Sequence, residues 1–217
     1  MNDLLVYINT INPISFLIII TLCNALFKLK KKITINKKLL ILILSVSTLS
    51  EFLTVIFIVL NFNICFIYNT YFIINGLSWL LIITNEMKFR KVKSILILLF
   101  LLFSLSNILF IERLNLNFYT FIIGALLYVS IFIYESYKQL NRENLNYFKT
   151  NNFILLIAPI LFFLGMSIVF GFRNSGIKDV IIFNKIELYT LITFTVNIIY
   201  YTLINLFIFK ERKLQNA

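Results

Sequence analysis

Long, uninterrupted apolar runs are the feature that most constrains how this chain folds. A helix needs about 20 mainly apolar residues to cross the hydrocarbon core of a membrane, and the sequence has seven such runs between polar or charged breaks. They cover about residues 4–27, 39–60, 64–84, 94–111, 118–134, 153–170 and 188–209. The runs lack the alternation of a membrane β-strand, and helices bond their own backbone within lipid. We therefore expect an all-α membrane protein, with residues 1–217 forming a single bundle of seven transmembrane helices.

The composition excludes several classes of soluble protein and enzyme. Of the 217 residues, 60% are hydrophobic and 13% are charged, whereas about a quarter of the residues in soluble domains are charged. The chain has no His and two Cys, so we expect no catalytic triad, no metal site and no cofactor. Cys23 and Cys65 fall on opposite sides of the predicted membrane, too far apart to form a disulfide.

The basic residues predict the orientation of the bundle. Lys and Arg number 20 against nine Asp and Glu, for a net charge of +11. Sixteen of the 20 follow the first, third, fifth and seventh runs; the other four are Arg113, Arg173, Lys178 and Lys185. Loops rich in Lys and Arg stay in the cytoplasm, so we expect the N-terminus outside, the C-terminus in the cytoplasm, and a multi-pass protein of the cell inner membrane. The charge therefore indicates orientation and contact with lipid, and we expect no nucleic-acid partner.

One acidic residue lies deep within a predicted span. Glu51 is about twelve residues into the second run, and ionisable groups inside a membrane are costly and usually face a protein interior. The third and seventh runs carry polar and aromatic residues at helical spacing, and several fall at a similar depth. We expect a ligand or proton site near the middle of the bilayer, built from Glu51, Tyr71, Asn75, Trp79, Asn197 and Tyr200.

A purely structural interpretation of the same residues stays open. Asn, Ser and Thr side chains commonly form hydrogen bonds between membrane helices and hold a bundle together. A buried Glu can also be protonated and bonded to a neighbour, because burial disfavours its charged form. The sequence therefore predicts where a site would lie and leaves open whether Glu51 is functional or structural.

The predicted topology and a few residues resemble two groups of known proteins. Seven spans, an outer N-terminus and a basic cytoplasmic tail look like the membrane sensor modules of bacterial histidine kinases and related signalling proteins. The chain is also similar to small uncharacterised seven-helix proteins of Bacteroidota, in which a Glu in helix two and a Tyr–Asn pair early in helix three recur, here Glu51 with Tyr68 and Asn69. A kinase needs a phospho-accepting His, which this chain lacks. The resemblance therefore implies signalling through a cytoplasmic or membrane protein partner.

Four functions are compatible with these observations. The leading hypothesis is a receptor-like sensor, in which a small or lipidic ligand, or a change of protonation, shifts helix packing. The alternatives are a small transporter or channel that uses Glu51, a membrane-embedded lipid-modifying enzyme, and a structural subunit of a membrane complex. Lysoplasmalogenase-like lipid hydrolases are similar in size, but they have a further helix and acidic residues that this chain does not supply. An enzyme is the less favoured class, because no second acid lies beside Glu51 in a predicted span.

Overall fold

Helices make up most of the described chain. The computed structural model of the protein describes residues 13–29, 34–87, 90–113, 115–173, 180–182 and 186–216. The long helices are α2 (Pro13–Lys28), α3 (Ile35–Val59), α4 (Cys65–Thr84), α5 (Arg90–Ser106), α6 (Phe118–Asn141), α8 (Asn151–Gly171) and α9 (Leu188–Asn216). The shorter elements are the π-helix η1 (Asn107–Ile111), the helix α7 (Leu145–Lys149), and the antiparallel strands β1 (Ile181–Ile182) and β2 (Ile186–Glu187).

Six of the described helices are long and apolar enough to cross a membrane. They are α3, α4, α5 together with η1, α6, α8 and α9, and they coincide with six of the predicted runs. Helix α2 has 16 residues, so it is about 24 Å long at 1.5 Å per residue and falls short of a hydrocarbon core of about 30 Å. The rest of that run, residues 4–12, lies outside the described residues. The structure therefore supports an α-helical membrane bundle with six candidate spans, and the seventh span and the orientation of the termini stay predictions.

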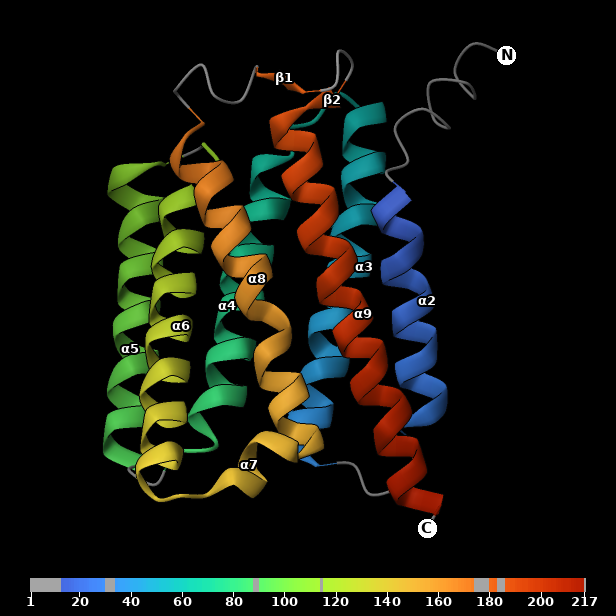
Figure 1. Cartoon of the computed structure of the whole chain (residues 1–217). Helices are drawn as coiled ribbons and strands as arrows, with labels where there is room; N and C mark the ends of the chain where they lie inside the picture. The colour runs from blue at the N-terminus through green and yellow to red at the C-terminus, as the bar shows by residue number, and fades with distance from the viewer. Residues whose placement is uncertain are drawn as a thin grey trace.

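The long helices run alternately in opposite directions, and the start of α2 and the end of α9 lie at opposite ends of the bundle (Figure 1). The end that carries β1 and β2 is called the hairpin end, and the other is called the C-terminal end. Helices α3 and α4 pack side by side as a helical hairpin, as the short break between their runs predicts. Their connection includes Asn61, whose φ is 56°, a left-handed conformation that Asn adopts more readily than most residues.

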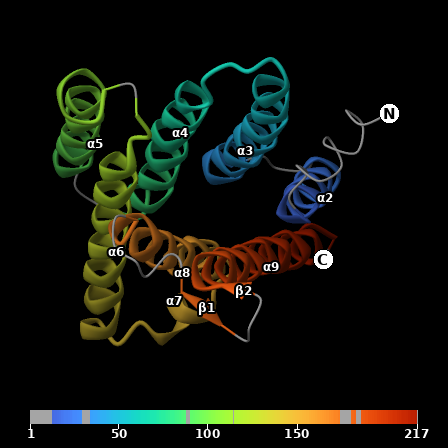
Figure 2. The same cartoon turned by 90° about the horizontal axis from the view of Figure 1, so that it is seen from above.

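Among the long described helices, six form a ring and one lies outside it. Successive neighbours in the ring are α2, α3, α4, α6, α8 and α9, and α9 also packs on α2 (Figure 2). Helix α5 lies outside, against α4 and α6. Its Phe100 fits against two glycines: a Cβ on Gly76 would lie 2.8 Å, and one on Gly124 2.9 Å, from atoms of the Phe100 ring. Small residues thus let α5 approach the ring closely, as is common between membrane helices.

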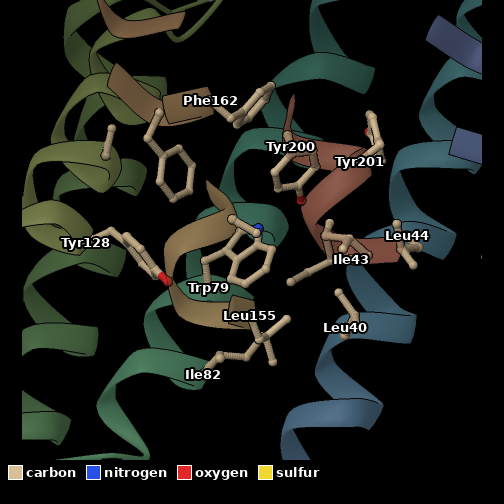
Figure 3. Close-up of a cluster of buried hydrophobic side chains, with 14 of the residues drawn as sticks. Leu40, Ile43, Leu44, Trp79, Ile82, Tyr128, Leu155, Phe162, Tyr200 and Tyr201 are labelled. Carbon is tan, nitrogen blue, oxygen red and sulfur yellow. The ribbon is translucent and has the colours of Figure 1, made fainter. Parts of the chain in front are cut away.

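The most tightly packed part of the ring lies toward the C-terminal end. The fully buried Trp79 contacts Tyr128 and Tyr200 edge to face, with ring centroids 6.1 Å apart in each pair (Figure 3). The same core cluster contains fully buried aliphatic side chains: Leu40, Ile43, Leu44, Leu80, Ile82 and Leu155. The outer surface is also apolar, with exposed side chains such as Phe16, Phe66 and Phe110. An apolar exterior is what a bundle needs where lipid is its solvent.

Helix ends differ from the predicted spans mainly at the C-terminal end. Helix α6 continues to Asn141 and α9 to Asn216, whereas the apolar runs end at about residues 134 and 209. The added turns contain Lys, Glu, Gln and Arg, which favour helix without being apolar, so a hydropathy pattern misses them. The sequence also did not predict α7 or the β1–β2 pair, because segments this short show no clear periodicity.

Candidate functional site

A cavity of about 320 Å³ lies inside the ring, in the half nearer the hairpin end. Two helices line it with regularly spaced residues: α9 with Tyr189, Thr193, Asn197 and Tyr201, and α8 with Phe162, Met166 and Phe170. A spacing of four keeps side chains on one face of a helix, so each helix turns a single face to the cavity. The volume falls at the lower end of the range for small-molecule pockets, about 300–1,000 Å³.

The lining residues divide into a polar and an apolar set. The polar set comes from α3, α4 and α9, and consists of Ser47, Ser50, Glu51, Tyr68, Tyr71, Tyr189, Thr193, Asn197 and Tyr201. The apolar set comes from α2, α4, α6, α8 and the loop before α6, and consists of Ile14, Ile18, Phe72, Leu116, Phe118, Phe121, Phe162, Met166 and Phe170. The cavity is therefore amphipathic, with hydroxyl, amide and carboxylate groups from some helices and mainly aromatic rings from the others.

Glu51 is the acidic residue among those that line the cavity. Its Oε2 accepts a hydrogen bond of 2.8 Å from the hydroxyl of Ser15, in the first turn of α2. A carboxylate can accept about four hydrogen bonds. Within the described ranges, Ser15 is the hydrogen-bond donor found for this carboxylate, and neither Lys nor Arg forms an ion pair with it. Most of its capacity to accept hydrogen bonds is therefore left for a molecule in the cavity.

Tyrosine hydroxyls gather around this carboxylate. Tyr68, Tyr71 and Tyr201 all lie close enough to Glu51 to feel its charge, and the hydroxyls of Tyr71 and Tyr201 both approach Ser47. Ser47 donates its own hydrogen bond to the carbonyl of Ile43, at 2.8 Å. Three helices, α3, α4 and α9, thus bring hydroxyl groups to one part of the cavity.

The six predicted site residues fall into two layers. Glu51, Tyr71 and Asn197 line the cavity, and Asn197 also donates to the carbonyl of Thr193 at 2.8 Å. The other three residues, Asn75, Trp79 and Tyr200, do not line it.

The second layer lies directly behind the first. The Asn75 amide donates to the Tyr71 hydroxyl at 3.3 Å. Tyr200 stacks on Phe162 with ring centroids 4.9 Å apart and contacts Trp79 on its other side. Three of the six expected residues therefore line the cavity, and the other three pack behind that lining.

The expected depth of Glu51, near the middle of the bilayer, stays a prediction. Glu51 lies eight residues before the end of the 25-residue helix α3, about 12 Å from that end. No sequence pattern singles out Ser15 or the aromatic residues of α8, because neither belongs to a polar stripe. Tyr189 lies at the start of a span, where Tyr commonly acts as an interfacial anchor.

A separate polar cluster borders the cavity at the hairpin end. The buried Glu112 accepts hydrogen bonds from the Asn107 amide at 2.7 Å and from the backbone N–H of Tyr119 at 3.0 Å, and it pairs with Arg173 at 3.2 Å. The Arg173 guanidinium lies 4.1 Å from the ring centroid of Phe118, which lines the cavity. This cluster joins η1, the start of α6 and the end of α8 beside the cavity.

Asn69 has a clear structural role at the same end. Its amide donates to the carbonyl of Asn115 at 2.9 Å, and its side-chain oxygen accepts from the backbone N–H of Asn117 at 2.8 Å. These two bonds hold the loop whose Leu116 lines the cavity. Of the Tyr–Asn pair, Tyr68 therefore contributes to the lining and Asn69 holds the loop beside it.

The described residues form a cavity but no metal centre. No three His, Cys, Asp or Glu side chains come together among them. Compared with known protein families, curated proteins and solved structures, the chain matches none. The class of protein therefore follows from the fold alone, which is an α-helical membrane bundle with an amphipathic internal cavity.

Proposed function

We propose that the protein is a receptor-like membrane protein whose cavity binds a small amphipathic ligand beside Glu51. The observation that carries this proposal is the placement of one carboxylate in a ligand-sized cavity that is otherwise lined by hydroxyl groups and aromatic rings. Small-molecule pockets are typically apolar with a few polar groups that fix the orientation of the ligand. If Glu51 were purely structural, it would need neither a cavity beside it nor a carboxylate with unused capacity to accept hydrogen bonds.

Binding is better supported than conduction. The lining reaches along α9 from Tyr189 to Tyr201 and ends there. Toward the C-terminal end, the fully buried Trp79, Leu155 and Ile204 occupy the interior of the ring. A channel needs a path to both ends of the bundle, and this packing leaves the cavity in one half. A lipid hydrolase has less support, because the described lining has a single carboxylate for acid–base chemistry.

Helix α9 provides the route from cavity to partner. It lines the cavity over about three turns and continues to the C-terminal end, where Glu211 pairs with Lys37 of α3 at 2.6 Å and accepts from Asn151 of α8 at 2.8 Å. A ligand that contacts α9 and favours one packing of the helices shifts the population toward it. The altered junction of α3, α8 and α9 is then presented to a protein partner on the predicted cytoplasmic face of the inner membrane.

The test is whether filling the cavity removes a retained ligand. We expect the protein purified in detergent to release, on solvent extraction, a small molecule or lipid in stoichiometric amount, detected by mass spectrometry. Thr193→Phe fills the cavity and should abolish retention. Thr190→Phe, on an exposed face of the same helix, is the matched control and should retain the ligand. Equal retention by wild type and a well-folded Thr193→Phe variant contradicts the proposal.

A further inference from the structure

Among the described residues that line the cavity, one is acidic and none is basic. Of the 18 described lining residues, Glu51 is the single charged group. Arg173 contacts the lining at Phe118, and its charge is paired with Glu112. Glu51 is half-buried and has no cationic partner among the described residues. Withdrawing an unpaired carboxylate further from water is costly, so an occupant that carries positive charge is favoured over a neutral or anionic one.

We infer that the ligand is an organic cation, an ammonium group with apolar substituents, held between Glu51 and the tyrosine rings around it. The inference rests on the proposed function and gives its ligand a chemical class. The charge of the ammonium pairs with the carboxylate, and its substituents contact the apolar set of lining residues.

The aromatic rings supply the second element of recognition. Four Tyr and five Phe side chains line the described cavity, and Tyr68, Tyr71 and Tyr201 lie near enough to Glu51 to interact with its charge. A cation within about 6 Å of an aromatic ring is attracted to the ring face, and several rings around a carboxylate form the kind of cage that binds quaternary ammonium groups. The same rings also provide the apolar contact that alkyl substituents need.

Other occupants fit these groups less well. A divalent metal ion prefers several charged or polar oxygen ligands, and the described lining of the cavity holds no second acid beside Glu51. A proton alone neutralises the carboxylate but leaves a cavity of about 320 Å³ to be filled. That volume equals on the order of ten water molecules at about 30 Å³ each, which suits an ammonium compound with short alkyl groups.

Three water-soluble probes of nearly the same shape separate charge from fit. They are choline, its neutral isostere 3,3-dimethylbutan-1-ol, and the anion 3,3-dimethylbutanoate. Binding is measured by titration calorimetry on the full chain in lipid nanodiscs, with empty nanodiscs as the blank. We expect choline to bind, the neutral isostere to bind at least about thirtyfold more weakly, and the anion to give no binding. The reason is that a Glu51 carboxylate enclosed without a positive partner costs at least about 2 kcal/mol. This comparison uses the wild-type protein and needs no variant.

Variants then assign the effect to particular residues. Glu51→Gln should reduce the affinity for choline to that of the neutral isostere, while Glu143→Gln, which removes an exposed charge near the C-terminal end, should leave it unchanged. Tyr71→Leu should weaken choline binding by about 2- to 30-fold through loss of a cation–π contact, and Tyr71→Phe, which keeps the ring, by less.

The outcomes separate this inference from the proposed function. If the neutral isostere or the anion binds as tightly as choline, or Glu51→Gln keeps full affinity, the ligand is not a cation and the inference fails. If none of the probes binds while the wild-type protein still releases a ligand that Thr193→Phe lacks, the inference fails and the proposed function stands. If no probe binds and no ligand is released, both fail.

Discussion

The two halves of the bundle use aromatic residues in opposite ways. Toward the C-terminal end, Trp79 and Tyr128 pack among fully buried aliphatic side chains and fill the interior. Toward the hairpin end, Phe121 contacts Phe162 and Phe170, and these rings line a cavity instead of closing it. One half therefore fixes the positions of the helices, and the other keeps space between them.

Acidic residues follow the same division. At the C-terminal end, Glu211 is held by Lys37 and Asn151. At the cavity, Glu51 receives one described hydrogen bond. Buried polar atoms without a partner among the described residues occur in both halves, for example Thr193 Oγ1 beside the cavity and Asn151 Oδ1 at the C-terminal end. A site at the cavity needs a rigid half to hold it, as functional sites generally do.

The largest expected effect is the loss of the packed centre. Trp79→Ala should lower the free energy of unfolding by about 3–5 kcal/mol, because the cavity it leaves removes packing contacts on all sides. Met166→Ala, at the cavity, should cost at most about 2 kcal/mol, because that side chain lacks neighbours on one side already. Equilibrium unfolding in mixed micelles measures both. Equal losses would mean that the two halves are packed alike.

The next effect concerns the cluster that borders the cavity. Glu112→Ala leaves Arg173, the Asn107 amide and the Tyr119 N–H without their acceptor, and should cost about 2–3 kcal/mol, less than a fully buried pair because Arg173 is partly exposed. Glu187→Ala, at an exposed position of the same end, is the control and should change stability by less than about 0.5 kcal/mol. A neutral Glu112→Ala would show that the cluster does not hold η1, α6 and α8 together.

Hydropathy and charge were sufficient to predict much of the fold and little of the site. The apolar runs predict the long helices, because every span must be long enough to cross the hydrocarbon core and must satisfy its backbone hydrogen bonds internally. They do not predict the ring. The choice of neighbouring helices depends on how their side chains fit together, as Phe100 fits against Gly76 and Gly124. The outward position of α5 is likewise invisible in a run that is as apolar as the others.

For the site, the sequence predicts the unusual residue and misses its surroundings. Glu51 stands out because a carboxylate is rare within a span. Spacing on a single helix could not separate Asn197, which lines the cavity, from Tyr200, which lies behind it, because the two are close on the same helix. Ser15 and Met166 come from other helices with no polar pattern, and only the packing of the ring brings Ser15 to Glu51 and Met166 to the cavity.

A smaller effect tests whether the cavity half depends on close helix contact. A Cβ on Gly165 of α8 would collide with Val196 Cγ1 of α9, and a β-branched side chain in a helix has little freedom to move away. Gly165→Ala should therefore cost about 1–3 kcal/mol. Gly171→Ala, which meets nothing within 4 Å, is the matched control and should be close to neutral. A neutral Gly165→Ala would show that α8 and α9 can separate freely beside the cavity.

The smallest effect is a pH dependence at the C-terminal end. Burial, together with the charges of Glu86 and Glu135, raises the pKa of Tyr147 from 10.0 to about 12. Because the folded state holds this proton more tightly than the unfolded state, its contribution to stability is complete below pH 10 and is lost as the pH rises from about 10 to 12. Tyr147→Phe cannot ionise, so its unfolding temperature should fall less steeply than that of the wild type across this range. Parallel curves for the two proteins would mean that Tyr147 ionises as easily in the fold as in the unfolded chain, and that the C-terminal end is more loosely packed than its ring contacts with Phe148 and Phe153 indicate.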